Sequence, residues 1–145
     1  METFPTATKG VIISADNKVS YGEFPLPEVG SSDVLIKIHS AAINPSDVLY
    51  LAGVYPAGKN KPTTAGFEGS GTVVATGESD AATQLLNKNV CFFASGVSSP
   101  GSWGEFTVVN YSSCVVLPGD LTLEEGATCL VNPLTVQGFI LESET

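Results

Sequence analysis

The side chains of this sequence that could bind a metal ion are three cysteines and one histidine. Cys91, Cys114 and Cys129 are widely spaced, and no Cys-x-x-Cys pair is present. The single histidine, His39, completes no familiar zinc-ligand spacing with them. Free cysteine is among the residue types most often buried. We therefore interpret the cysteines as small, mostly buried apolar residues of a protein in a reducing compartment, and we predict no metal site.

Three closely spaced glycines could instead hold a phosphate group. Gly66, Gly69 and Gly71 follow the order Gly-x-x-Gly-x-Gly, which differs from the Gly-x-Gly-x-x-Gly of dinucleotide-binding loops. The Lys-Ser/Thr ending of a nucleotide P-loop is also missing. Glycine within a strand often marks a bend where another backbone approaches closely. We predict that structural role and no phosphate site.

The charge of the chain excludes several classes of partner. The 145 residues include 15 acidic and 6 basic side chains, a formal net charge of −9, and all six basic residues are lysines. Nucleic-acid binding needs clustered cations that neutralise phosphates. Without arginine, the usual two-pronged contact to phosphate or carboxylate groups is missing. We expect binding neither to nucleic acid nor to an acidic membrane surface.

The N-terminal third of the chain is predicted to form strands followed by a short helix. Residues 9–15 and 18–27 indicate two strands around an Asp16-Asn17 turn. Residues 33–43 alternate as a strand does, and His39 lies there with no obvious acidic neighbour. In 44–53, Asn44 is a plausible helix cap, Pro45 suits the first turn, and the helix ends at Gly53.

The rest of the chain continues this pattern of short elements. We predict a loop over 54–64, a strand through Val73 and Val74, one helical turn at 81–86, strands at 90–95 and 103–109, a helix from a Thr122–Glu125 capping box to about Leu130, and a last helix opened by Pro133. Strands and helices do not alternate, so no Rossmann unit is expected. The fold class predicted is mainly β with short helices, a partly open antiparallel β-barrel with helices at its C-terminal end.

Five segments in series resemble a known family. They look like the N-terminal domain of the medium-chain dehydrogenase/reductase superfamily, in particular its quinone oxidoreductase and enoyl reductase branches, and the resemblance covers about residues 9 to 141. The segments are AAINPSDVLYLAGVYP, GFEGSGTVVATG, NVCFFASG, GSWGEFTVVN and LTLEEGATCLVNPLTVQGF. The resemblance implies a GroES-like barrel at 1–131, with 132–145 as the start of a helical connection to a Rossmann domain that this chain lacks.

Two positions separate this chain from zinc-bearing members of that superfamily. In those members a cysteine stands at or near the position of Asn44, and a histidine stands at the position of Phe67. The four-cysteine structural zinc lobe of those members is also missing from this sequence. Zinc catalysis needs about three protein ligands and an open position. The resemblance therefore points to the zinc-free branch.

The resemblance also implies which residues act in catalysis. Tyr55 matches a tyrosine that donates a proton or orients the substrate, and Asn44 matches an asparagine near the nicotinamide ring. Each has an equally good structural explanation, because Tyr55 could pack at the barrel mouth and Asn44 could serve only as a helix cap. The two roles of Asn44 are compatible, since an amide both accepts and donates.

Further residues are assigned to binding by the same resemblance. Thr135 matches a threonine near the nicotinamide, with Asn132 just before it, although both could equally serve helix-start chemistry. Phe67 and Tyr50 would at most line the substrate pocket. Trp103 would line either the core or the cleft.

The function implied is that of the substrate-side domain of a zinc-independent NAD(P)H-dependent oxidoreductase. Such an enzyme would reduce quinones, enones or enoyl thioesters by hydride transfer, with NADP(H) or NAD(H) held largely by the missing domain. We expect the chain alone to be inactive and to bind no cofactor. The alternative is a non-catalytic structural or interaction subunit derived from such a reductase.

The last helix and the N-terminus suggest partners and location. The segment PLTVQGFIL should expose Leu134, Val136, Phe139 or Ile140, so we expect a homodimer or a partner chain there. The first ten residues carry no secretory signal, and no apolar run reaches the ~18 residues of a membrane span. An intracellular, reducing location, cytoplasmic or mitochondrial, is expected.

Overall fold

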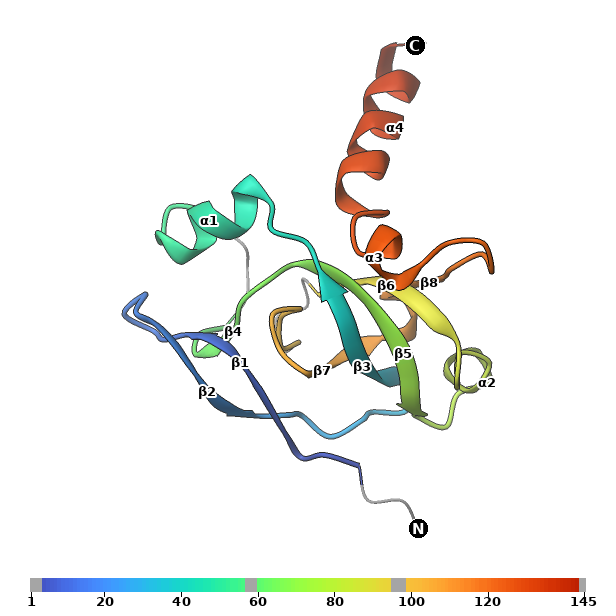
Figure 1. Ribbon diagram of the computed structural model, residues 1–145, viewed down its shortest axis with the longest axis horizontal. Coiled ribbons are helices and arrows are strands. Elements are labelled where there is room, and N and C mark those ends of the chain that lie inside the picture. The colour runs from blue at the N-terminus through green and yellow to red at the C-terminus, as the bar shows by residue number, and fades with distance from the viewer. Residues whose placement is uncertain (1–3, 57–59, 95–98, 144–145) are drawn as a thin grey trace.

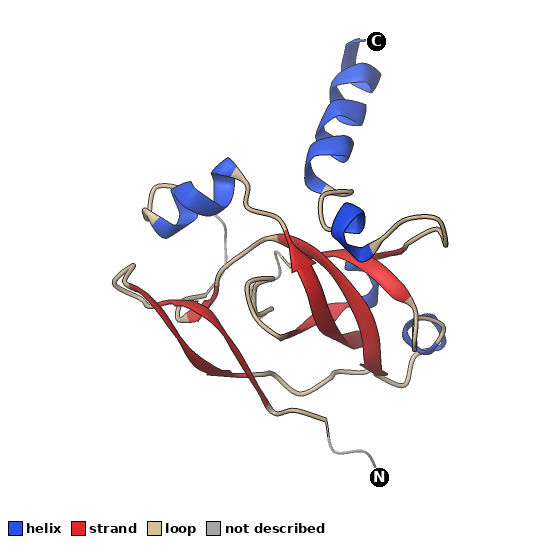
Figure 2. Ribbon diagram, viewed as in Figure 1, coloured by secondary structure: helices blue, strands red, loops and turns tan. Residues whose placement is uncertain are grey.

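The strands of the molecule form two antiparallel sheets (Figures 1 and 2). The computed structural model describes residues 4–56, 60–94 and 99–143. The smaller sheet has the order β2-β1-β4, from β1 (Ala7–Ile13), β2 (Val19–Pro25) and β4 (Thr63–Thr64). The larger sheet has the order β7-β3-β5-β6-β8, from β3 (Asp33–Ala41), β5 (Glu68–Thr76), β6 (Asn89–Phe93), β7 (Phe106–Asn110) and β8 (Cys114–Val116). Within the described residues neither sheet closes on itself, which confirms the mainly β, partly open antiparallel architecture.

The two sheets are joined where β1 passes the segment before β7. The Val11 N–H donates to the Trp103 carbonyl at 2.9 Å, and Gly10 pairs with Gly104 in an isolated bridge. β1 also pairs with β2 along its whole length, around a turn in which Asn17 has a φ of 63°. That turn lies at the Asp16-Asn17 position predicted.

Strand β3 packs on both of its faces, which its alternating sequence alone does not require. Val34 and Ile36 are fully buried on one face, in the main core with Val73 and Phe92. Leu35, on the other face, is 1% exposed in a separate cluster. The centre of the larger sheet is therefore covered on both faces.

The glycine cluster serves the close packing that we predicted for it. Gly66 has a φ of +92°, and a Cβ there would collide with the Trp103 ring and the Ser102 hydroxyl. A Cβ on Gly71 would collide with the Lys37 carbonyl of the neighbouring strand. Side chains at these positions would push the two backbones apart.

In the described part of the chain, four α-helices lie around the sheets: α1 (Pro45–Leu51), α2 (Asp80–Thr83), α3 (Leu123–Gly126) and α4 (Val131–Ser143). A 3₁₀ turn, η1 (Tyr111–Ser113), precedes β8. The Thr122–Glu125 capping box is present as predicted. Helix α3 nevertheless ends at Gly126 rather than near Leu130, because glycine favours helix poorly and the following turn buries Leu130 against Cys91 and Leu117.

Helix α4 projects away from the sheets (Figure 1). None of its described residues is buried. The exposure expected for its apolar side chains is found, with Leu134 at 63% and Phe139 at 71%. No helix within the described ranges is long and apolar enough to cross a membrane.

Candidate functional site

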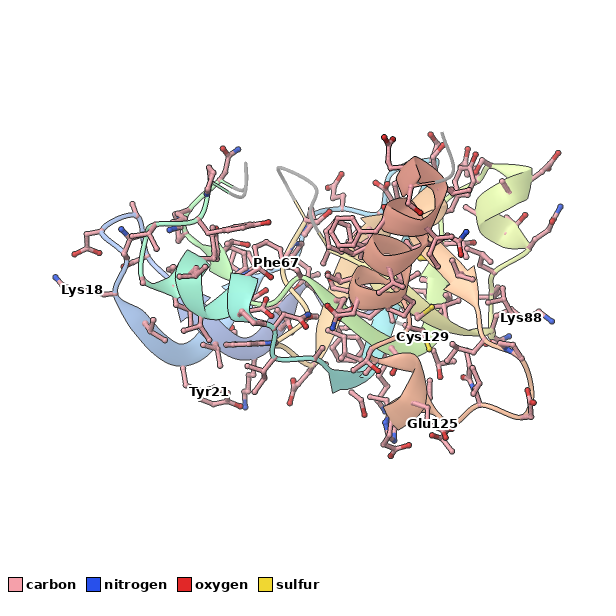
Figure 3. The ribbon with its side chains drawn as sticks, turned by 90° about the horizontal axis from the view of Figure 1, so that it is seen from above. Lys18, Tyr21, Phe67, Lys88, Glu125 and Cys129 are labelled. Carbon is pink, nitrogen blue, oxygen red and sulfur yellow. The ribbon has the colours of Figure 1, made fainter. Side chains whose placement is uncertain are left out.

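Phe67 lies at the centre of a group of aromatic rings. It sits just before β5, and its side chain is 5% exposed. Its ring centroid lies 5.3 Å from that of Tyr50, 5.9 Å from that of Tyr55 and 6.5 Å from that of Phe93. In Figure 3, Phe67 appears between α1 and α4. Phe67 therefore connects the α1 side of the site with the side below α4.

The two tyrosines beside Phe67 differ in accessibility. Tyr55 follows α1 and is 43% exposed, so a ligand can reach its side chain. Tyr50, within α1, is 3% exposed, and its hydroxyl has no hydrogen-bond partner among the described residues. Burial raises the pKa of Tyr50, and the Lys61 ammonium lies 4.3 Å from its ring centroid. Tyr50 thus packs against Phe67, whereas Tyr55 is the phenol that solvent reaches.

Asn44 occupies the cap position of α1, as predicted, and its side chain also makes hydrogen bonds outside the helix. The Asp47 carboxylate accepts the Asn44 backbone N–H at 2.7 Å and holds the first turn. The Asn44 side-chain amide donates from Nδ2 to Glu68 Oε1 at 2.8 Å. Asn132 Nδ2 donates to Asn44 Oδ1 at 3.4 Å. The fold therefore brings Asn44 and Asn132 together across 88 residues of sequence.

Glu68 is the residue of this site that the sequence reasoning missed. Its side chain is 1% exposed, and its second oxygen, Oε2, accepts the backbone N–H of Val131 at 2.8 Å. The one available signal was an acid at the start of an apolar strand, next to Gly69. An acid in such a place must find partners when it is buried.

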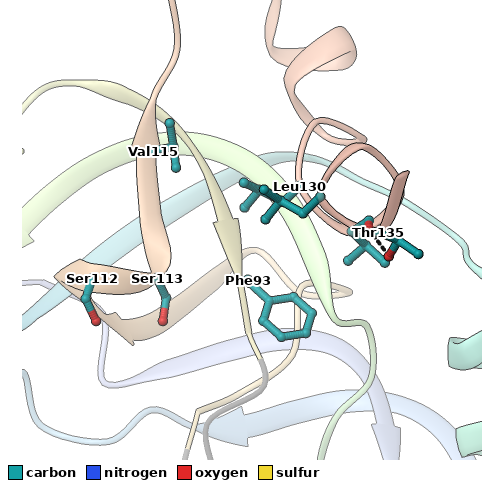
Figure 4. Close-up of a pocket in the computed structure, with 8 residues that line it drawn as sticks. Phe93, Ser112, Ser113, Val115, Leu130 and Thr135 are labelled. Atoms are coloured by element: carbon teal, nitrogen blue, oxygen red, sulfur yellow. Dashed lines mark hydrogen bonds between the residues drawn. The ribbon is translucent and has the colours of Figure 1, made fainter. Parts of the chain in front are cut away.

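A pocket of about 410 Å³ lies between the sheet and α4 (Figure 4). Thr135 lines it, and the Thr135 hydroxyl donates to the Val131 carbonyl at 2.7 Å. Its walls combine apolar side chains with hydroxyl groups, from Phe93, Ser112, Ser113, Val115, Leu130, Val131, Leu134 and Thr135. Phe93 belongs to both this pocket and the aromatic group, so the two adjoin each other.

Trp103 lies apart from that pocket. Its indole N–H donates to the Ala42 carbonyl at 2.9 Å, and its ring packs against Gly66. It lines a second hollow of about 370 Å³ together with His39, and this hollow shares no lining residue with the first. The Glu124 carboxylate lies 3.7 Å from His39 Nε2, so the sequence-based view that His39 lacks an acidic neighbour was wrong.

The cysteines lie close to one another around β6. Cys91 is buried, Cys114 and Cys129 are half-buried, and all three are free thiols. Burial, with a smaller effect of Cys91, raises the pKa of Cys114 to about 12. Burial also raises the pKa of Cys91. In the part of the chain that the structure describes, no group of three or more His, Cys, Asp or Glu side chains could hold a metal ion.

The sequence matches a family model and curated proteins. The model described as the alcohol dehydrogenase GroES-like domain matches residues 30–119. Prostaglandin reductase-3 of Bos taurus is 38% identical over 95 residues, which are 66% of this chain and 24% of that protein. The mitochondrial enoyl-acyl-carrier-protein reductase of Arabidopsis thaliana is 34% identical over an alignment of 128 positions that covers 84% of this chain and 32% of that protein.

The fold also matches solved structures. A protein from Mesorhizobium loti, described as an NADPH:quinone reductase, superposes with a TM-score of 0.87 and 34% identity over 99% of this chain and 46% of that chain. Our chain thus spans between 24% and 46% of the length of these three relatives.

Proposed function

The chain belongs to the alcohol dehydrogenase GroES-like domain family of the medium-chain dehydrogenase/reductase superfamily, and we propose on this basis that it is the substrate-side domain of a zinc-independent NAD(P)H-dependent oxidoreductase. Its substrates would be quinones, enones or enoyl thioesters. The observation that carries this proposal is the grouping of Asn44, Tyr55 and Phe67 on the side of the barrel that faces α4, in a chain that aligns with a reductase over 99% of its length.

Two donors of this site suit an α,β-unsaturated carbonyl. As the β-carbon of such a substrate is reduced, negative charge develops on the carbonyl oxygen, and a hydrogen-bond donor there stabilises the transition state. Tyr55 offers an exposed phenol. Asn44 offers the amide N–H that Glu68 does not use, since one amide nitrogen carries two hydrogens.

The coenzyme would lie against the side of the domain that carries α4. When bound, a nicotinamide coenzyme supplies the hydride. The Thr135 hydroxyl donates to Val131 and keeps its lone pairs for an N–H donor such as a carboxamide. The apolar walls of the adjacent pocket suit a flat ring. Because the chain has no arginine, contacts to the coenzyme phosphates fall to a second domain.

The side chains present at two positions support the proposed zinc independence. An amide stands at Asn44 and a benzyl group at Phe67; one N–H of the Asn44 amide donates to Glu68, and its oxygen accepts from Asn132. Neither position provides the thiolate or imidazole of a zinc ligand set. The charge-stabilising role therefore falls to Tyr55 and Asn44.

The test is an assay of NADPH oxidation with a quinone and with a crotonyl thioester. The polypeptide to assay is the longest natural one that contains this chain. Replacing Tyr55 by Phe removes one donor to the developing oxyanion, so kcat should fall by about 10²-fold. The matched control is Tyr21→Phe, which removes an exposed phenol outside the site. Equal kcat values for the two variants would contradict the role of Tyr55.

The 145-residue chain by itself should leave NADPH unconsumed, because a single substrate-side domain holds no pyrophosphate loop. Steady NADPH loss with the purified chain would overturn this expectation. Inactivity of every natural form would favour a non-catalytic subunit instead.

A further inference from the structure

Glu68 joins three parts of the chain that are far apart in sequence. It starts β5, and its carboxylate is enclosed by protein, with 1% of the residue exposed. One oxygen accepts from the Asn44 side chain and the other from the Val131 backbone, both at 2.8 Å. These partners lie 24 and 63 residues away. A single buried side chain thus links β5, the start of α1 and the start of α4.

The contact with Val131 fixes the beginning of α4. Val131 is the first residue of that helix, and its N–H has no partner within the helix. A carboxylate at this end is also favoured by the helix dipole. Since no described residue of α4 is buried, contacts at its first turn decide where the helix points.

The contact with Asn44 fixes which edge of that amide faces the site. A carboxylate only accepts hydrogen bonds, so Asn44 must turn its NH₂ group toward Glu68. Its oxygen then faces the other way, where it accepts from Asn132 Nδ2 at 3.4 Å. The second N–H of the Asn44 amide is used by neither of these two contacts.

We propose that Glu68 is a positioning residue that holds the Asn44 amide in one orientation and clamps the start of α4 to the barrel. The donor at Asn44 and the helix that carries Thr135 then keep a fixed spacing, because both are tied to the same carboxylate. The value of this device for catalysis rests on the proposed function, whereas the device itself can be tested without any reaction.

The direct test is NMR spectroscopy of the unmodified 145-residue chain. We expect scalar couplings across hydrogen bonds from the Glu68 carboxyl carbon to the backbone nitrogen of Val131 and to Nδ2 of Asn44. The Val131 amide, which would otherwise be a free helix-end N–H, should exchange slowly with solvent. This measurement needs no variant, so it stands even if substitutions at this position prevent folding.

The second test is the variant Glu68→Gln. Glutamine keeps the shape, but its NH₂ must face one of two groups that are themselves donors. We expect loss of one coupling and a changed Asn44 side-chain signal, with Val131 exchange faster by roughly tenfold or more. Glu68→Asp keeps the charge and should preserve at least one of the two contacts. Glu124→Gln, which removes an exposed carboxylate, is the matched control and should change neither signal.

The results that would contradict the role of Glu68 differ from those that would contradict the proposed reductase function. Missing couplings to Asn44 in the unmodified chain, or unchanged Asn44 and Val131 signals in a folded Glu68→Gln variant, would overturn the proposal. A lower melting temperature with an unaltered Asn44 signal would show a merely structural role and would also overturn it. Because no step depends on turnover, a failure of the reductase assay leaves this result untouched.

Discussion

Gly66 has a backbone conformation that residues with side chains rarely adopt. Its φ is +92°, and the Trp103 ring and Ser102 hydroxyl occupy the space of a Cβ. We predict that Gly66→Ala lowers the free energy of unfolding by about 2–5 kcal/mol, from the left-handed backbone and the overpacking together. Urea denaturation measures this change. Gly119→Ala, with no atom within 4 Å of its Cβ, is the control and should shift stability by less than about 0.5 kcal/mol.

The contacts of Asn44 explain why the sequence left two roles open for this residue. Asn44 was interpreted from sequence either as a cap or as an active-site amide. In the structure it stands at the cap position while its side chain bonds to Glu68 and Asn132. Each of these contacts depends on where distant strands and helices meet, which no local pattern encodes.

Helix α3 illustrates a prediction at the scale of the element. The Thr122 N–H and hydroxyl both donate to the Glu125 carboxylate at 2.9 Å, and these bonds hold the pKa of Glu125 below its ordinary value of 4.5. Because the pKa of Glu125 is lower in the folded chain than in the unfolded chain, its ionised form stabilises the fold above pH 4.5. This contribution is lost as the pH falls through the pKa of the folded chain. Glu125→Gln should therefore flatten the acid side of the stability curve.

Urea denaturation midpoints, measured at about pH 6 and at about pH 3.5, report this effect. These two pH values lie on either side of the pKa of glutamate. Glu28→Gln removes the same charge from an exposed loop and is the control. If both variants lose stability in acid as steeply as the parent chain, the cap does not contribute as described.

The whole molecule carries an uncovered apolar helix. Phe139 and Val136 of α4 are 71% and 56% exposed, and such surfaces promote association. We predict that the 145-residue chain self-associates through α4. Burying each side chain of this kind contributes about 1.5–3 kcal/mol, so Val136→Ser combined with Phe139→Ser should weaken dimers more than ~10-fold.

Light scattering over a range of concentrations measures that association. Val54→Ser removes an apolar side chain that is 68% exposed outside α4 and serves as the control. A strictly monomeric chain at high concentration would contradict the prediction.

The sequence by itself determined the order and type of most elements, because alternation, caps and glycines act over a few residues. It also showed that positions 44 and 67 carry an amide and a benzyl group in place of zinc ligands, because this depends on residue type alone. The sequence did not predict the two-residue strand β4, because Thr63 and Thr64 form a strand only by pairing with β1.

Only the tertiary structure decided which side chains meet. Glu68 reaches Asn44 and Val131, Glu124 comes beside His39, and Phe67 lies among three aromatic rings. These contacts join residues brought together by sheet order and strand register. Burial then makes them specific, because an enclosed carboxylate is tolerated only where donors converge on it.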